Sequence, residues 1–218
     1  MADQDSFITE VSDEVRRDKL FALMRKYGWI AVALVVVIVG GAAIFEWRKA
    51  QAIAQAQKIG DEVLVALGEE SPQAQADALS GLSTQGEGGQ KAVIDLLKAS
   101  SLMEAGDGDG AAALLEALSS DTATPQIYRD IARLKLAVSA GNLSAEDRIS
   151  VLGPLLQPGS PLRVLAMEQK ALIEIESGTT DAAIETLQGL VSDAETTEDL
   201  RRRASQLIVA LGGALGQG

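Results

Sequence analysis

The chain has 218 residues, none of them cysteine or histidine, and its 31 acidic and 19 basic residues give a net charge of −12. This composition excludes thiol nucleophiles, histidine bases and most transition-metal sites. It also disfavours nucleic acid as a partner, because phosphates repel an acidic protein. We therefore expect no catalytic residue, no metal ligand and no cofactor.

Residues 1–26 predict an amphipathic leader, formed by one helix or two short ones. Phe7, Val11 and Val15 recur every four positions, and acidic residues precede basic ones, which suits a helix dipole. Two interpretations stay open for this face. It is either an interfacial helix that orients the next segment or a docking helix for a cytoplasmic or membrane partner.

Residues 29–45 read WIAVALVVVIVGGAAIF and contain no ionisable side chain. With residues 27 and 28 the uncharged helix is roughly 28 Å long at 1.5 Å per residue, close to the ~30 Å hydrocarbon core of a bilayer. Aromatic residues flank the run at both ends, as at two membrane interfaces. The sequence predicts a transmembrane helix over residues 27–47. Its anchor residues are Trp29, Gly40, Gly41, Phe45 and Trp47.

Two alternatives to a membrane span fit the run less well. A buried core helix carries a polar stripe, which is absent here. A cleaved signal peptide has a short basic leader and an apolar region of about 7–15 residues.

Five basic residues precede the span and three follow it within a comparable distance, which favours a cytoplasmic N-terminus. The remainder, with 14 basic and 25 acidic residues from Glu46 onward, is then expected outside the cytoplasm.

Residues 48–88 predict linking helices, since alanine, glutamine and lysine are good helix formers. Gly68 ends the first of them, and Pro72 suits the first turn of a short helix over residues 73–82. From residue 89 to residue 211 the chain repeats as paired helical runs that meet at turn glycines.

The turn glycines Gly106, Gly141 and Gly178 are thirty-five and thirty-seven residues apart. Paired helices with a period of about 34 are typical of a tetratricopeptide-type solenoid. The expected fold is therefore all-α, with one transmembrane helix followed by a tetratricopeptide-like α-solenoid of helical hairpins. We expect residues 212–218 to form a flexible tail.

The first and third repeats share an inner packing pattern, in which Ala111, Leu115 and Leu118 match Ala183, Leu187 and Leu190. The middle repeat departs from it, because Leu134 stands where the others have alanine and Gly153–Pro154 interrupts its second helix. A final helix over residues 197–211 is expected to cap the stack, with the arginines at 201–203 on a solvated face.

The leader FITEVSDEVRRDKL, the sequence KYGW that enters the span and the repeat domain, in this order, resemble bacterial single-pass tetratricopeptide-repeat proteins. The chain is similar to the YfgM-type ancillary subunits of the SecYEG translocon. This resemblance implies a periplasmic interaction domain held at the inner membrane. It also implies translocon components, a membrane-anchored periplasmic chaperone and exported chains as partners. The alternative is an accessory or assembly subunit of another inner-membrane complex, respiratory or envelope, held by its span and leader.

In such solenoids the first helix of each pair lines the concave face. Counted from the turn glycines, the candidate partner groove contains Tyr128, Ile131, Lys135, Leu165 and Glu168. A tyrosine beside a lysine suits an acidic or extended peptide. The competing interpretation is that the apolar members belong to the core. The sequence Asp107-Gly108-Asp109-Gly110 lacks the later ligands of a calcium loop, so we expect a tight turn there.

Overall fold

The computed structural model describes residues 2–83, 88–139 and 143–214, and within α1 the side chains of residues 2–24, 27, 28, 31 and 32 lie outside the description. The chain forms two compact units, residues 1–58 and residues 59–218. Each unit is considered by itself. In both, the regular secondary structure of the described residues is helical, which confirms the all-α class.

Helix α1 spans Ala2–Leu67, and residues up to Lys58 form the first unit. Apolar side chains project from it into the surroundings, and Trp29, Val37 and Phe45 are each 70–71% exposed. Within the part of the chain that the structure describes, no helix is both long enough and apolar enough to cross a membrane. The predicted span over residues 27–47 is thus not confirmed, and four of its side chains lie outside the description.

The predicted docking face of the leader, Phe7, Val11 and Val15, also lies outside the described side chains, although the backbone there is helical. At the other end of the predicted span, Gly40 and Gly41 have open space around the position that a Cβ atom would take. The indole of Trp47 is 62% exposed.

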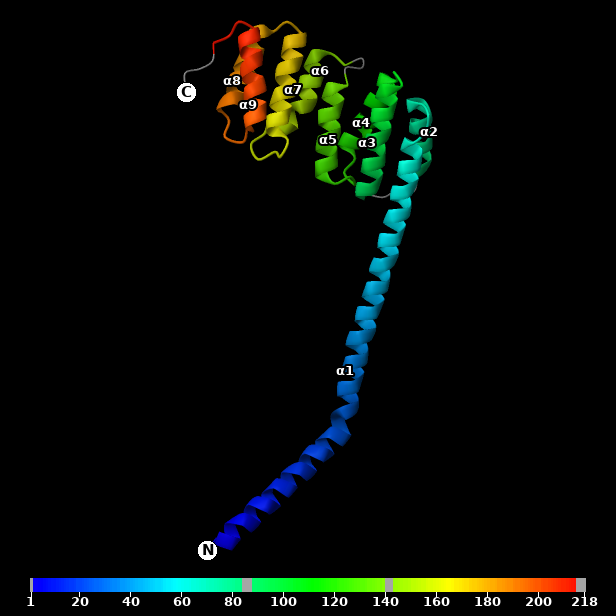
Figure 1. Cartoon of the computed structure of the whole chain (residues 1–218), viewed down its shortest axis with the longest axis vertical. Coiled ribbons are helices and arrows are strands. Elements are labelled where there is room, and N and C mark those ends of the chain that lie inside the picture. Colours follow the sequence, from blue (N-terminus) through cyan, green and yellow to red (C-terminus); the bar gives the residue numbers. More distant parts are fainter. Residues whose placement is uncertain (1, 84–87, 140–142, 215–218) are drawn as a thin grey trace. The chain divides into compact units, whose positions relative to one another are not determined.

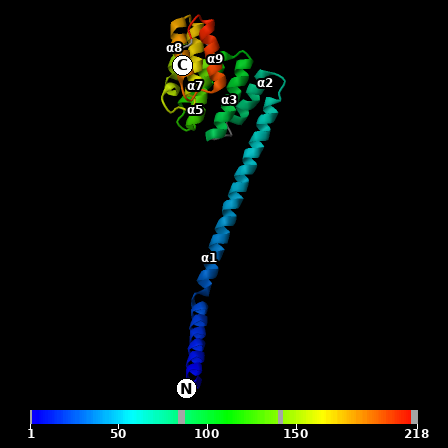
Figure 2. The same cartoon turned by 60° about the vertical axis from the view of Figure 1, so that its left-hand side comes forward.

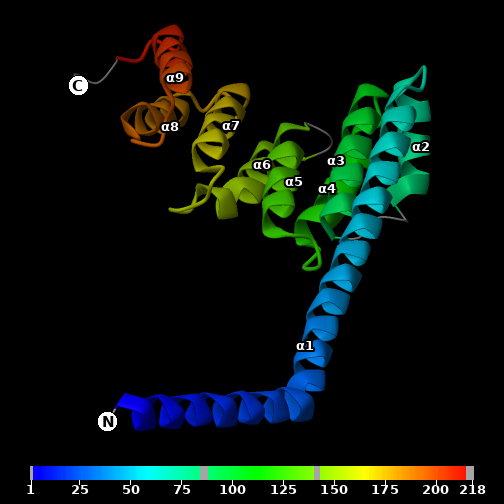
Figure 3. The ribbon, with the colours of Figure 1, turned by 60° about the horizontal axis from the view of Figure 1, so that its bottom comes forward.

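The second unit is a stack of helical hairpins (Figure 1). Its elements after α1 are α2 (Pro72–Ser83), α3 (Gly88–Glu104), α4 (Gly108–Ser120), α5 (Gln126–Val138), α6 (Ala145–Leu152), the 3₁₀ helix η1 (Gly153–Leu156), α7 (Arg163–Glu176), α8 (Thr180–Ser192) and α9 (Glu198–Ala210). Consecutive helices pack side by side in chain order, as two further views show (Figures 2 and 3). This arrangement confirms the solenoid of hairpins.

The last turns of α1 belong to this stack. Ala66 is buried in one cluster with Leu79 of α2 and Ile94 of α3, and Ile59 and Val63 pack against that cluster. These apolar residues of α1 are therefore the inner face of its last turns, which start the solenoid.

Helices α3, α7 and α9 end in the same way. Gly106, Gly178 and Gly212 have φ values of +85°, +78° and +81°, a conformation that favours glycine. In each case the amide of the residue after the glycine donates to the carbonyl oxygen five residues earlier, at 2.9 Å. Helix α9 is thus built like the first helix of a hairpin. The expected turn glycine at 141 lies outside the described residues.

The second helices bury one shared pattern. Counted from the first residue of each helix, the fourth, eighth and eleventh positions are all buried. They are Ala111, Leu115 and Leu118 in the first hairpin, Arg148, Leu152 and Leu155 in the second, and Ala183, Leu187 and Leu190 in the third.

The middle hairpin keeps this pattern although more residues separate its two helices than in the other hairpins. Helices α4 and α8 begin two residues after their turn glycines, whereas α6 begins four residues after position 141. The expected interruption is confirmed, since α6 ends at Leu152 and Gly153–Pro154 opens η1. Leu134 packs against the cluster that contains Leu152 and Leu155.

Arg148 stands where the other two second helices have alanine, and it is 8% exposed. Its Nε donates to the carbonyl oxygen of Ala137 at 2.7 Å, and its Nη1 donates to Oε2 of Glu176 at 2.6 Å. One guanidinium therefore connects α6 with the end of α5 and the end of α7. A buried arginine without these partners would be strongly unfavourable.

We expect Arg148→Met, which keeps most of the side-chain volume, to lower the free energy of unfolding by about 1–3 kcal/mol. The substitution leaves the Ala137 carbonyl and Glu176 without their donor. Urea unfolding followed by circular dichroism measures the change. The control is Arg202→Met on α9, whose side chain is 67% exposed and should leave the midpoint unchanged. Equal midpoints for the two variants would contradict the prediction.

Candidate partner-binding surface

The predicted groove residues lie on two first helices, α5 and α7. Helix α5 carries Tyr128, Ile131 and Lys135, spaced so that they share one side of the helix. Helix α7 carries Leu165 and Glu168 near its N-terminus. The structure shows which of these side chains remain available to a partner.

Lys135 reaches across to the preceding first helix. Its Nζ donates to the Oγ of Ser100 on α3 at 2.9 Å, so α3 and α5 are in contact here. Among the described residues, no carboxylate forms an ion pair with Lys135. A partly buried ammonium bonded to a neutral hydroxyl gains from a nearby negative charge.

Tyr128 covers the start of α3. A Cβ atom added at Gly89 would lie 3.1 Å from Cε2 of Tyr128, so the absence of a side chain at Gly89 makes room for the ring. Ile131 is half-buried and packs against the core cluster of α3, α4 and α5. The interpretation that the apolar residues belong to the core therefore applies to Ile131. The ring of Tyr128 is only partly buried, so part of it is accessible to a partner.

Three first helices each carry at least one exposed large apolar side chain. Val93 of α3 is 41% exposed, Val138 of α5 is 50% exposed and Leu165 of α7 is 39% exposed. We call the surface formed by Val93, Ser100, Tyr128, Lys135, Val138 and Leu165 the first-helix face. Exposed apolar side chains together with a cation that has no ion pair among the described residues can bind a peptide segment of complementary pattern.

Glu168 is engaged by the last helix. Nε of Arg203 lies 3.0 Å from Oε1 of Glu168, and Nη2 of Arg203 lies 3.2 Å from Oε2. The two residues therefore form a bidentate ion pair between α9 and α7. Glu168 is only 13% exposed at its side chain. Its carboxylate thus holds α9 on the stack, and we leave it out of the first-helix face.

The arginines at 201–203 do not form one solvated face. Arg201 donates to the carbonyl oxygens of Val191 at 3.0 Å, Thr196 at 3.1 Å and Asp193 at 3.3 Å. Its guanidinium thereby satisfies the end of α8 and the loop that leads to α9. The expectation for this residue was wrong because helix periodicity does not show which loop a long side chain reaches.

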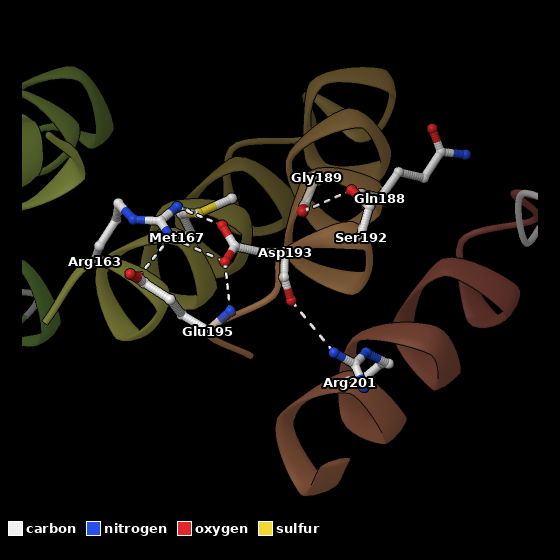
Figure 4. Close-up of polar contacts among 8 residues, drawn as sticks. All are labelled: Arg163, Met167, Gln188, Gly189, Ser192, Asp193, Glu195 and Arg201. Atoms are coloured by element: carbon white, nitrogen blue, oxygen red, sulfur yellow. Dashed lines mark hydrogen bonds and ion pairs between the residues drawn. The ribbon is translucent and has the colours of Figure 1, made fainter. Parts of the chain in front are cut away.

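The same loop is held from the other side by Arg163 at the start of α7 (Figure 4). Arg163 pairs with both carboxylate oxygens of Asp193, one of them at 2.9 Å, and with Glu195 at 2.6 Å. The Arg163 guanidinium, with the amide of Glu195, holds the pKa of the Asp193 carboxyl below its usual value. The two carboxylates in turn raise the pKa of Arg163.

The repeat spacing does not indicate this loop, but a second pattern in the sequence does. The loop before α5 is built alike, seventy-two residues earlier: the Asp121 carboxylate accepts from the amide of Ala123, as Asp193 accepts from that of Glu195. Arg129 donates to the Thr124 carbonyl oxygen at 2.9 Å, as Arg201 does to that of Thr196. The shared pattern is Asp, two residues, Thr and a later Arg.

A stack of helical hairpins with an accessible first-helix face defines a repeat protein that mediates contacts between proteins. The model of the tetratricopeptide repeat-like domain family matches residues 24–147, more than half of the chain. The chain therefore belongs to the tetratricopeptide repeat-like domain family. No curated protein and no solved structure shows significant similarity to it.

We expect Asp193→Asn to lower stability at pH 7, because the ion pairs with Arg163 lose one carboxylate. A carboxyl whose pKa is lowered in the folded state stabilises the fold above its ordinary pKa of 3.8, and this contribution is lost as the pH falls further. The difference between the wild-type and variant proteins should therefore shrink below about pH 4.

Urea unfolding at pH 7 and pH 3 measures this difference. The matched control is Asp121→Asn, since Asp121 also has a lowered pKa, caused mainly by the Ala123 amide and the Thr124 hydroxyl. Asp121 has no arginine ion pair among the described residues, so its substitution should cost less at pH 7. Equal losses in the two variants would show that the ion pair between Arg163 and Asp193 adds nothing to stability.

Proposed function

We propose that this protein is a membrane-anchored adaptor that binds other proteins through its first-helix face. The observation that carries the proposal is that the first helices expose Val93, Val138 and Leu165 and also carry Lys135, a cation without an ion pair in the described part of the chain. A tetratricopeptide repeat-like domain is suited to this role, because its stacked helices offer an extended surface. The proposal assigns no catalytic activity and no cofactor.

The chemistry of the first-helix face favours an extended segment with an acidic residue among apolar ones. The acidic group would replace the Ser100 hydroxyl as the partner of Lys135 or share the ammonium with it. The ring of Tyr128 adds an apolar wall with a polar tip, a combination that is frequent at protein interfaces.

The membrane anchor in this proposal is the apolar run of residues 29–45. It is supported by the seventeen consecutive residues without an ionisable side chain and by the exposure of Trp29, Val37 and Phe45 in the first unit. The excess of basic residues before the run supports a cytoplasmic N-terminus and a periplasmic repeat domain at a bacterial inner membrane.

The proposed partners are translocon components, a membrane-anchored periplasmic chaperone and exported chains. This choice rests on the resemblance of the leader and the KYGW entry to the YfgM-type subunits. Membrane anchoring also supports these partners, because confinement to one membrane raises the local concentration of two proteins. Weak contacts between them are then sufficient for binding.

A second candidate function is favoured by the exposed apolar side chains of α1 itself. In that case the protein is an accessory or assembly subunit of another inner-membrane complex, respiratory or envelope. The contacts would then be made by the leader face, Phe7, Val11 and Val15, and by the run that contains Gly40 and Gly41, where small residues permit close approach of a partner helix.

The discriminating experiment is affinity purification of the full-length protein in mild detergent, with co-purifying proteins identified by mass spectrometry. We expect Tyr128→Ala with Lys135→Ala to lower partner recovery by about tenfold, the effect of 1.4 kcal/mol of lost binding. The matched control is Arg202→Ala with Lys98→Ala, which removes two positive charges outside the first-helix face; the Arg202 side chain is 67% exposed. Unchanged recovery from the Tyr128/Lys135 variant would contradict the assignment of the face.

The leader is tested in parallel by replacing Phe7, Val11 and Val15 with serine. If this variant loses its partners while the Tyr128/Lys135 variant keeps them, the accessory-subunit function is the correct one. Identification of translocon subunits and periplasmic chaperones among the partners would support the first function, and a stable set of subunits from another complex would refute it.

The anchor is tested by Val36→Arg with Ile38→Arg. Each central arginine costs about 2.5–3.5 kcal/mol for insertion into a bilayer, so the variant should leave the carbonate-washed membrane fraction. The control, Val36→Ala with Ile38→Ala, should stay in that fraction with the wild-type protein. A wild-type protein found in the soluble fraction would overturn the membrane assignment.

A further inference from the structure

A cleft of about 360 Å³ lies between α4, α5 and the α6–η1 segment. Its lining residues are Ala112, Glu116, Ser119, Ser120, Arg133, Leu136, Leu143, Ser150, Val151 and Pro154. Most of them belong to the second helices of two successive hairpins, so the cleft is separate from the first-helix face. It is a feature that the sequence pattern did not indicate.

The cleft exists because the wall from the middle hairpin is short and the wall from α4 has small side chains. Helix α6 has 8 residues and ends at Leu152, whereas α4 and α8 each have 13 residues. Pro154 of η1 forms part of the wall where a longer helix would continue. Opposite it, α4 contributes alanine and serine side chains, and the buried Leu136 of α5 forms part of the floor.

The two charged residues of the lining differ in their partners. Nη1 of Arg133 lies 2.7 Å from Oδ1 of Asp130, and its Nη2 donates to the carbonyl oxygen of Ser119 at 3.0 Å. The positive charge of Arg133 is thus neutralised within α5. The carboxylate of Glu116 has no ion pair among the described residues, and only its backbone carbonyl accepts bonds, from the hydroxyls of Ser119 and Ser120.

We propose that this cleft binds an apolar side chain next to a cationic one, presented by a basic and apolar segment of a partner protein. The apolar side chain would contact Leu136 and Val151, and the cation would pair with Glu116. The volume is at the low end of the range for ligand sites, about 300–1,000 Å³, and suits one or two side chains rather than a large cofactor.

The charge of the domain supports a cationic occupant. From Glu46 onward the chain has 25 acidic and 14 basic residues, and such a field attracts positively charged segments. The cleft and the first-helix face therefore select opposite charges: Glu116 selects a cation, and Lys135 selects an anion. This inference does not depend on the proposed function of the first-helix face.

The test is an NMR titration of the full-length protein in mild detergent, with methyl-labelled leucine and valine. The probe is phenethylammonium, an aromatic ring with one cation, and 2-phenylethanol and 3-phenylpropionate are its neutral and anionic counterparts. We expect saturable shifts of the Leu136, Leu143 and Val151 methyls with phenethylammonium and at least fivefold weaker binding of the other two probes. The neutral probe also reports partition into the detergent.

Two variants separate the charge from the cavity. Glu116→Gln should weaken phenethylammonium binding by about three- to tenfold, and Ala112→Trp should abolish it by filling the cleft. The matched control is Glu185→Gln, an exposed carboxylate on α8 outside the lining, which should change nothing. Equal binding of all three probes, an unchanged affinity in Glu116→Gln, or no saturable shift at these methyls would overturn the proposal.

Discussion

The solenoid depends on the close packing of each second helix against its first helix through one small and two large buried positions. Ala111 and Ala183, both 0% exposed, let the helix axes approach, and the leucines that follow fill the space between hairpins. On the first helices, Ala99 and Ala171 are also 0% exposed and accept this approach. Burial of apolar area at these positions is the main stabilising term of the stack.

The middle hairpin obeys the same constraint with a different residue. Arg148 occupies the small position, and its long side chain cannot be accommodated by apolar packing alone. The guanidinium is satisfied by the Ala137 carbonyl and by Glu176. The shortened α6 and η1 of the same hairpin also form one wall of the cleft, so one irregular repeat gives the solenoid a local feature that regular repeats lack.

The two surfaces assigned to binding differ in charge and in the type of helix that forms them. Lys135 on a first helix lacks a carboxylate partner, and Glu116 on a second helix lacks a cationic one, in contrast to ion pairs such as Arg163 with Asp193 and Arg203 with Glu168. Those two ion pairs connect α7 with the α8–α9 loop and with α9. These ion pairs between distant parts of the chain stabilise the stack, whereas the two charges assigned to binding form no ion pair among the described residues.

The sequence by itself determined the helical class, the hairpin period and the buried residues of the first and third repeats, because local glycine turns and leucine spacing encode them. Only the tertiary structure decided the register of the middle repeat, the roles of Arg201, Glu168 and Arg148, and the position of the cleft. Each of these depends on a contact between residues distant in the chain, such as Glu168 with Arg203, 35 residues apart. Helix periodicity records which side of a helix a residue occupies, but not which neighbour meets it there.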